Sequence, residues 1–256
     1  MYNKKWPAVF TGHGYPMNAI TDNPARRGWA DAGRKIGRPQ VIIAMTSHFE
    51  GDGTCVHVAP DNPQLFDIVD LPEEIYNVKY KPLNSPEYAR KVLEMIGDNA
   101  FPDNTWGIDH ALWTTLSNMF PEADIPVVVI STDTGLSPEE MYGLGRRLKP
   151  LREDGALLFA TGNIVHNVDM VDHDFNGAWD WAWEFDEAVR RLVEKRDIEA
   201  LLKPELIRNH ELALPTLDHY YPLLFILGAS DENDELTVFN EYCELASLSM
   251  TSYLFC

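Results

Sequence analysis

Short apolar segments alternate with amphipathic segments along most of this chain. Four apolar segments are rich in β-branched residues and end at small or polar ones, and they cover residues 8–10, 41–45, 125–130 and 156–160. Strands that are buried on both faces have this composition, because helices cover both sides of the sheet that they form. We therefore expect these segments to be strands of a parallel or mixed sheet.

Helix-start signals lie between the predicted strands. Side chains that can accept a hydrogen bond from a first helical turn stand at Asn23, Ser85, Asp109 and Ser137. A proline follows three of them, and proline suits the first position of a helix, where no N–H donor is needed. Ser137 also forms a capping-box pattern with Glu140. We expect one helix over residues 110–119 and a longer one over residues 179–195.

The alternation of strand and helix patterns predicts an α/β fold. We expect a single three-layer domain over residues 1–256, with a central, mostly parallel or mixed sheet flanked by helices. No internal repeat, low-complexity tract or Gly/Ser-rich linker marks a boundary inside it. Residues 60–84 contain four prolines and interrupt the pattern. We expect this segment to form either a wall or lid over a site or a solvated insertion.

Composition and charge narrow the class of partner. The chain has 256 residues, of which 45% are hydrophobic, so it can bury a core. Its formal net charge of −19 repels phosphate backbones and anionic membranes, so we expect neither a nucleic acid nor a membrane as partner. No secretory signal pattern opens the chain, and no apolar run approaches the roughly 18 residues of a membrane span. Three cysteines without C-x-x-C spacing argue against disulfides and a thiolate zinc site, and we expect a cytoplasmic protein.

Three of the eight histidines stand where predicted strands end: His13, His48 and His166. In open α/β sheets, ligands bind outside the carboxyl ends of the strands, so we expect these side chains to point into one crevice. The glycines on either side of His13 let the backbone bend sharply there.

Two further histidines stand at predicted helix starts. His110 directly follows Asp109, and His219 falls in the first turn of a helix that we expect Thr216 to cap. Neutral imidazoles suit Fe(II), Zn(II) and similar metals, and histidine-rich sites without thiolates are more often catalytic than structural. No P-loop, H-E-x-x-H, G-x-S-x-G or dinucleotide motif is present. We interpret the other three histidines as hydrogen-bonded structural residues: they are His57, His173 and His210.

Five spaced motifs match a known family. They are Gly12-His-Gly-Tyr-Pro-Met-Asn18, Thr46-Ser-His-Phe49, Trp106-Gly-Ile-Asp-His110, Gly162-Asn-Ile-Val-His-Asn167 and Pro215-Thr-Leu-Asp-His-Tyr-Tyr-Pro-Leu-Leu224. Together, in this order and over nearly the whole chain, they resemble the 4,5-DOPA extradiol dioxygenases, which belong to the class III extradiol ring-cleavage dioxygenases. The resemblance is specific for the family and much less specific for the substrate.

The resemblance implies a metal-dependent enzyme that inserts both atoms of O2 into a catechol-type, DOPA-like aromatic. It makes His13, His48 and His219 metal ligands, with His166 as an acid/base or as a fourth ligand. It also places His110 against the substrate, as a second catalytic candidate. One divalent metal per chain is implied, with Fe(II) needed for activity, and Zn(II) would compete for the same ligands in a purified sample.

Three positions beside the motif histidines depart from the family pattern. Tyr15 stands where relatives usually have Ser, Phe49 where Trp often occurs, and Leu214 where His often precedes the Pro-Thr pair. These positions border the predicted pocket, so they bear on the substrate more than on the metal. We therefore take Tyr15, together with His110, as a substrate-binding candidate.

Two other functions would use the same residues. A zinc hydrolase would hold Zn(II) with the same histidines and polarise a water molecule. A non-enzymatic interaction protein, like the Memo-type signalling proteins that resemble this fold, would lack oxygenase activity, but the retention of all five histidines argues against it. For the enzyme we expect a small catechol and O2 as partners, and the sequence leaves open whether the chain forms a homo-oligomer.

Overall fold

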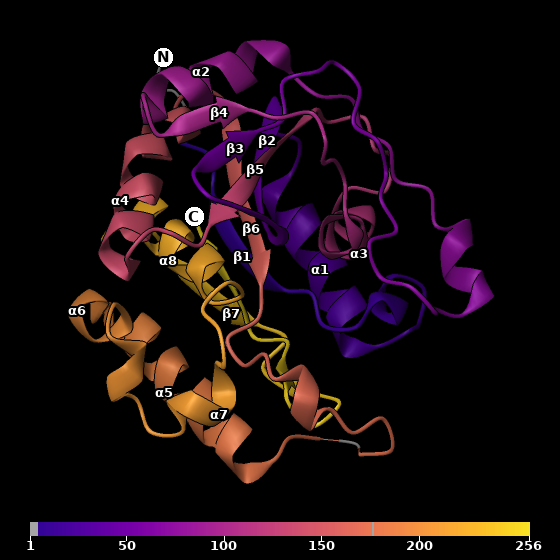
Figure 1. The fold of residues 1–256 in the computed structure, drawn as a ribbon, viewed down its shortest axis with the longest axis vertical. Coiled ribbons are helices and arrows are strands. Elements are labelled where there is room, and N and C mark those ends of the chain that lie inside the picture. Colours follow the sequence, from indigo (N-terminus) through magenta and orange to yellow (C-terminus); the bar gives the residue numbers. More distant parts are fainter. Residues whose placement is uncertain (1–4, 176) are drawn as a thin grey trace.

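The computed structural model describes residues 5–175 and 177–256, and eight of the described strands form one sheet. They are β1 (Ala8–Gly12), β2 (Val41–Gly51), β3 (Thr54–Val56), β4 (Ala100–Pro102), β5 (Val127–Asp133), β6 (Ala156–Gly162), β7 (Leu236–Phe239) and β10 (Ser252–Phe255). Their order across the sheet is β4-β3-β5-β2-β6-β1-β10-β7. The strands predicted from the sequence are therefore the four central ones, β5, β2, β6 and β1 (Figure 1).

The directions of the strands make the sheet mixed, as expected. The four central strands run parallel to one another, whereas β10 pairs antiparallel with both β1 and β7. The carboxyl ends of the central strands consequently lie at one edge of the sheet. All four strands extend past their predicted ends: β1 continues to Gly12, β6 to Gly162, β5 to Asp133, and β2 to Gly51 past an irregularity between Thr46 and Glu50. The strand β5 also begins later than predicted, at Val127.

Helices cover both faces of the sheet, so the expected three layers are confirmed (Figure 1). On one face lie α1 (Pro24–Ile36) and α3 (His110–Met119), and on the other lie α2 (Pro86–Ile96), α4 (Pro138–Leu148), α5 (Asp180–Lys195) and α8 (Tyr221–Ala229). Each face has its own core, which includes Trp29 and Trp113 on the first and Phe185 and Phe225 on the second.

Shorter elements connect these layers. They are α6 (Ile198–Leu201), α7 (His210–Ala213) and the 3-10 helices η1 (Pro16–Ala19), η2 (Glu73–Asn77), η3 (Lys149–Arg152), η4 (Val168–Met170) and η5 (Pro204–Leu206). A separate two-stranded hairpin is formed by β8 (Cys243–Glu244) and β9 (Leu248–Ser249).

The predicted helix starts have the expected chemistry. The side chains of Asn23, Ser85, Asp109 and Ser137 each accept a hydrogen bond from a backbone N–H in the first turn. The capping box between Ser137 and Glu140 is complete, because each side chain accepts from the backbone of the other residue. These caps are local interactions, which explains why short sequence patterns located them correctly.

The predicted helix start at Thr216 is wrong. The helix α8 begins at Tyr221, and the residues before it form turns in which the Leu217 carbonyl accepts from the backbone N–H groups of Tyr220 and Tyr221. A helix begun at Thr216 would place Pro222 in its interior, where proline cannot donate a backbone hydrogen bond and clashes with the preceding turn. In the observed helix Pro222 lies in the first turn, which tolerates it.

The proline-containing segment 60–84 packs against α3 instead of extending into solvent. The backbone N–H of Leu65 donates to the Ile108 carbonyl, and Trp113 Nε1 donates to the Leu65 carbonyl. Ile75 and Tyr80 of this segment are fully buried in the same core as α3. The segment is therefore part of the folded body.

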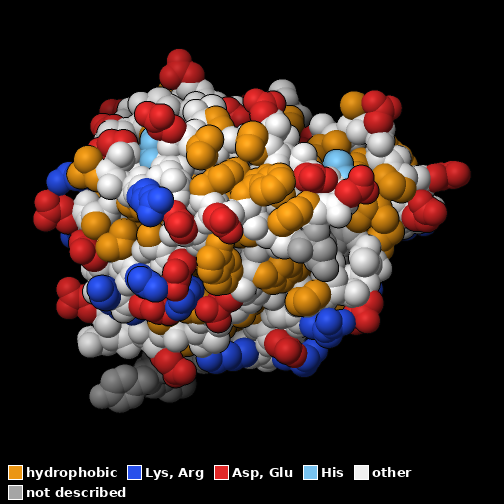
Figure 2. Space-filling view, turned by 90° about the horizontal axis from the view of Figure 1, so that it is seen from below, with side chains coloured by type: hydrophobic (Ala, Val, Ile, Leu, Met, Phe, Trp, Pro, Cys, Tyr) orange, Lys and Arg blue, Asp and Glu red, His pale blue; other side chains and the backbone are white. Residues whose placement is uncertain are grey.

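The surface shown in Figure 2 carries many acidic side chains around a central group of hydrophobic ones, with lysine and arginine toward its left and lower edges. Among the described helices, none is long and apolar enough to cross a membrane.

Candidate metal and catalytic site

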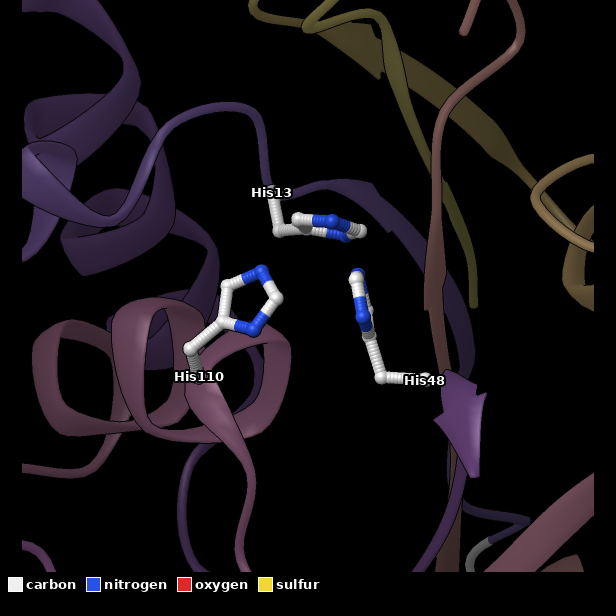
Figure 3. A group of neighbouring side chains, drawn as sticks. All are labelled: His13, His48 and His110. Carbon is white, nitrogen blue, oxygen red and sulfur yellow. The ribbon is translucent and has the colours of Figure 1, made fainter. Parts of the chain in front are cut away.

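Three histidines from different elements meet at the carboxyl edge of the sheet (Figure 3). His13 follows β1, His48 lies in the last part of β2, and His110 is the first residue of α3. One ring nitrogen from each of them lies within 4.8 Å of the others. The sequence therefore located the side of the sheet on which these side chains gather.

The two remaining motif histidines join the same cluster. His219 Nε2 lies 3.2 Å from His48 Nε2, and the ring of His166 stacks on the ring of His219 with centroids 3.4 Å apart. The ring centroids of the predicted ligand triad, His13, His48 and His219, are 5.0 to 5.4 Å apart. We call these five residues the histidine cluster: His13, His48, His110, His166 and His219.

His219 reaches the cluster through a close backbone approach instead of a helical turn. Its carbonyl accepts a hydrogen bond from the Asn163 N–H, just after β6, at 3.0 Å. A Cβ atom on Gly162 would lie 2.2 Å from that carbonyl oxygen, so only glycine fits there. The Gly-Asn pair that ends β6 thus holds the loop that carries His219.

Burial is the main cause that lowers the pKa of four cluster members, which are His13, His48, His166 and His219. Desolvation, followed by neighbouring imidazoles, lowers the pKa of His13 and His219 well below the ordinary histidine value. Desolvation is also the largest cause that lowers the pKa of His48 to about 3 and of His166 to about 4. Neutral imidazoles have the lone pairs that a divalent cation needs, so the donor set fits Fe(II) or Zn(II).

Hydrogen bonds at the Nδ1 atom orient three of the rings. His110 Nδ1 donates to Asp67 Oδ2 at 2.7 Å, and His219 Nδ1 donates to the carboxylate of Asp218. His13 Nδ1 lies 3.1 Å from Thr161 Oγ1. In each of these rings the Nε2 atom is left for another partner, which is the usual arrangement behind a metal-binding imidazole.

A buried carboxylate connects two motifs of the site. Asp109 caps α3 and also accepts hydrogen bonds from Thr46 Oγ1 at 2.8 Å and from Trp106 Nε1 at 2.9 Å. Desolvation raises the pKa of this carboxyl to about 6. Asp109 therefore ties the end of β2, which carries His48, to the helix start that carries His110.

The turn after His13 depends on a second carboxylate, that of the half-buried Glu244 in the β8–β9 hairpin. Its Oε1 atom accepts hydrogen bonds from the Tyr15 backbone N–H at 2.6 Å and from Asn18 Nδ2 at 2.7 Å. Gly14 has a φ of +57°, and a Cβ atom there would lie 2.1 Å from the same oxygen. Glycine at this position allows both the left-handed backbone and the close approach of the carboxylate.

A cavity of about 300 Å³ opens beside the histidine cluster. Four cluster members, His13, His48, His110 and His166, line it. Tyr15 also lines it, and its ring makes an edge-on contact with His173 at 5.8 Å between centroids. A cavity of this size holds a single-ring aromatic molecule.

Sequence reasoning did not assign His173 and Asp67 to the site. His173, interpreted as structural, lines the cavity, and Asp67 in the segment 60–84 bonds to His110. The only signal for Asp67 was the prediction that this segment could form a wall over a site. His57 lies as interpreted: its Nε2 atom pairs with the Asp61 carbonyl, away from the cluster.

Comparisons with known proteins agree with this geometry. Residues 8–256 match the family described as the catalytic LigB subunit of aromatic ring-opening dioxygenase. A protein of Escherichia coli K12 named 4,5-DOPA dioxygenase extradiol is 35% identical, over 98% of this chain and 95% of that protein. One of the same name from Beta vulgaris is 30% identical, over 96% of this chain and 95% of that protein.

A solved structure has the same fold. The crystal structure of an uncharacterized protein from Escherichia coli K12 superposes with a TM-score of 0.86 at 34% identity, and the match covers 98% of this chain and all of that one. The motifs, the histidine cluster and these matches agree over almost the whole sequence. The chain therefore belongs to the family of the catalytic LigB subunit of aromatic ring-opening dioxygenases and is an extradiol dioxygenase.

Proposed function

We propose that this enzyme is metal-dependent and opens the ring of a catechol, the aromatic diol that DOPA also contains, with both atoms of O2. The observation that carries the proposal is the convergence of five imidazoles beside a cavity of about 300 Å³ at the carboxyl edge of the sheet. A catechol fits such a cavity, and its two adjacent oxygens need neighbouring positions on one centre.

His13, His48 and His219 would hold the metal, because their ring centroids lie 5.0 to 5.4 Å apart and hydrogen bonds at Nδ1 orient two of the rings. Three protein ligands leave positions open for the substrate. When bound, Fe(II) supplies the electron-transfer chemistry that allows a catechol to react with dioxygen.

His166 is the proposed acid/base. Its imidazole is neutral at physiological pH, since burial lowers its pKa to about 4, so a ring nitrogen can accept the proton of a catechol hydroxyl. The same nitrogen can return that proton later in the reaction. Its stacked position on His219 keeps the ring next to the proposed metal ligands.

His110 is proposed to bind the substrate oxygen. Asp67 fixes the ring through Nδ1 and through the His110 backbone N–H, so that Nε2 is the atom left for a substrate oxygen. Tyr15 is proposed to border the ring substituent from the opposite turn.

The experiment is anaerobic loading of the protein with Fe(II), followed by measurement of oxygen uptake with a small panel of catechols. One O2 consumed per catechol, with the absorption of a ring-opened product, is the expected result. A loaded protein that consumes no oxygen with any catechol would contradict the proposal. Ester hydrolysis by the Zn(II)-loaded protein, without oxygen uptake, would point to a zinc hydrolase instead.

A further inference from the structure

The walls of the cavity restrict what the substrate can carry on its ring. We propose, resting on the catechol ring opening proposed above, that the physiological substrate has an uncharged, apolar ring substituent. The proposal depends on the chemistry of the residues that line the cavity and on where the basic residues of the chain lie.

The described residues that line the cavity include no lysine, arginine, aspartate or glutamate. Apart from the cluster histidines, the polar side chains at its surface are Tyr15 and His173. A carboxylate on the substrate would therefore meet no cationic side chain on these walls, and an ammonium group would meet no anionic one. Apolar walls favour an uncharged substituent over a charged one that they cannot pair.

The rest of the wall is apolar and comes from four parts of the chain, of which the first, after β1, contributes Gly14 and Pro16. Ile68 belongs to the segment 60–84, Val168 and Val171 follow β6, and Leu245 and Leu248 belong to the β8–β9 hairpin. Side chains of this kind stabilise an alkyl or other apolar substituent by excluding water from it.

The hairpin part of this wall is held in an unusual backbone conformation. Leu245 and Ala246 have φ values of +50° and +68°, a region that residues with a side chain seldom adopt. The Leu245 carbonyl accepts from the Asp172 N–H at 3.1 Å, and the Ala246 carbonyl accepts from the Trp179 N–H at 2.9 Å. These hydrogen bonds from residues that follow β6 hold the turn in this conformation. They thereby keep Leu245 at the wall of the cavity.

The basic residues of α1 follow His13 closely in the sequence, but their side chains interact with residues outside the cavity. Arg26 donates to Asn118, Arg27 pairs with Asp22, and Lys35 donates to Thr237. With a formal net charge of −19 on the whole chain, an anionic substrate is also repelled at long range.

The first test compares substrates of matched shape on the Fe(II)-loaded enzyme. The pair is 4-isobutylcatechol and 3,4-dihydroxyphenylacetate, which differ mainly in having an isopropyl group or a carboxylate at the end of the substituent. We expect kcat/KM to be about 100-fold higher for the isobutyl compound, in line with the cost of leaving a charged group unpaired. Dopamine extends the comparison to a cationic substituent and is expected to be poorer than 4-isobutylcatechol.

Binding provides a second readout that does not require turnover. Isothermal titration of the protein under nitrogen gives the Kd of each compound, and the same order is expected. If no catechol is turned over but the binding order holds, the proposed ring opening fails while the inference about the substituent stands. If all compounds are turned over and bound equally well, the ring opening stands and this inference is wrong.

A substituted variant tests the position of the wall. Val168 lines the cavity but is 64% exposed, so Val168→Arg adds a cation there without disturbing the core. We expect it to raise kcat/KM for 3,4-dihydroxyphenylacetate relative to 4-isobutylcatechol by about 10-fold. Met170→Arg is the matched control, because Met170 lies in the same 3-10 helix, is partly exposed and does not line the cavity. If the ratio of kcat/KM for 3,4-dihydroxyphenylacetate to that for 4-isobutylcatechol is the same in both variants, the proposed location of the substituent is wrong.

Discussion

Glu244 holds the backbone of Tyr15: its carboxylate oxygen lies 2.6 Å from the Tyr15 nitrogen, two residues after His13. The same oxygen accepts from Asn18, so one half-buried side chain fixes both ends of the turn that follows His13. Tyr15 and Glu244 lie near opposite ends of the sequence.

Glu244→Ala is expected to loosen this turn and to lower metal affinity by about 10- to 100-fold, as the loss of outer-sphere partners typically does. Glu244→Gln keeps an oxygen that can accept both hydrogen bonds and should restore most of the affinity. Equilibrium dialysis against Fe(II) or Zn(II) measures the effect. Glu241→Ala, an exposed change just before the same hairpin, is the control and should bind metal normally. Equal affinity in Glu244→Ala and Glu241→Ala would rule out this positioning role.

His219 and His166 are expected to differ in their effect on metal content. His219→Ala should lose the metal, whereas His166→Ala should keep it and turn over about 10² to 10⁴ times more slowly, the usual contribution of a positioned acid/base. Elemental analysis of each purified variant, next to oxygen uptake, separates the two roles. Loss of metal from His166→Ala would make His166 a ligand instead.

Tyr15→Ser is expected to widen the cavity beside His13. Tyr15 lines the cavity and contacts His173, so replacing its ring removes bulk from one side of the substrate space. The ratio of kcat/KM for large 4-substituted catechols to that for catechol should rise by roughly 10- to 200-fold. A ratio that does not change across the panel would show that Tyr15 has no part in specificity.

Asp186 is expected to make stability depend on pH. This carboxyl is fully buried on α5, where it accepts hydrogen bonds from the hydroxyl groups of Ser249 and Thr251, and desolvation raises its pKa from 3.8 to about 6. The folded state therefore keeps its proton to higher pH than the unfolded chain does. The free energy of unfolding contributed by this group consequently falls as the pH rises from about 4 to about 6.

Asp186→Asn removes this dependence, because an amide occupies the same space and does not ionise. Urea unfolding at pH 4, 5, 6 and 7 should show that the variant gains stability relative to the parent by up to about 3 kcal/mol across that range. If the free energy of unfolding of the two proteins changes in parallel with pH, Asp186 has the same pKa in the folded and unfolded chains.

Features that depend on neighbouring residues in the sequence were predictable. The caps at Asn23, Ser85, Asp109 and Ser137 are decided within a few residues, and the four central strands are marked by continuous apolar runs. The convergence of the cluster histidines followed from the rule that parallel strands end at one edge of a sheet.

Features that depend on contacts distant in the sequence were not predictable. Asp67 and Glu244 acquire their roles only when the segment 60–84 and the β8–β9 hairpin fold against the site. The position of His219 likewise depends on the approach of its backbone to Gly162. No local pattern in the sequence carries this information.

The antiparallel pairing of β1 with β10 has a consequence for the order of folding. Ala8 lies opposite Phe255, and the other neighbour of β1 is β6, so both partners of this strand are synthesised long after it. Contacts between such distant segments form slowly, and a strand whose residues are all buried in the native state is exposed to other chains in the meantime. During translation, therefore, β1 stays unpaired and prone to aggregation until β6 and β10 have been synthesised. Expression at lower temperature or with chaperones should raise the yield of the folded enzyme more than changes to its surface would.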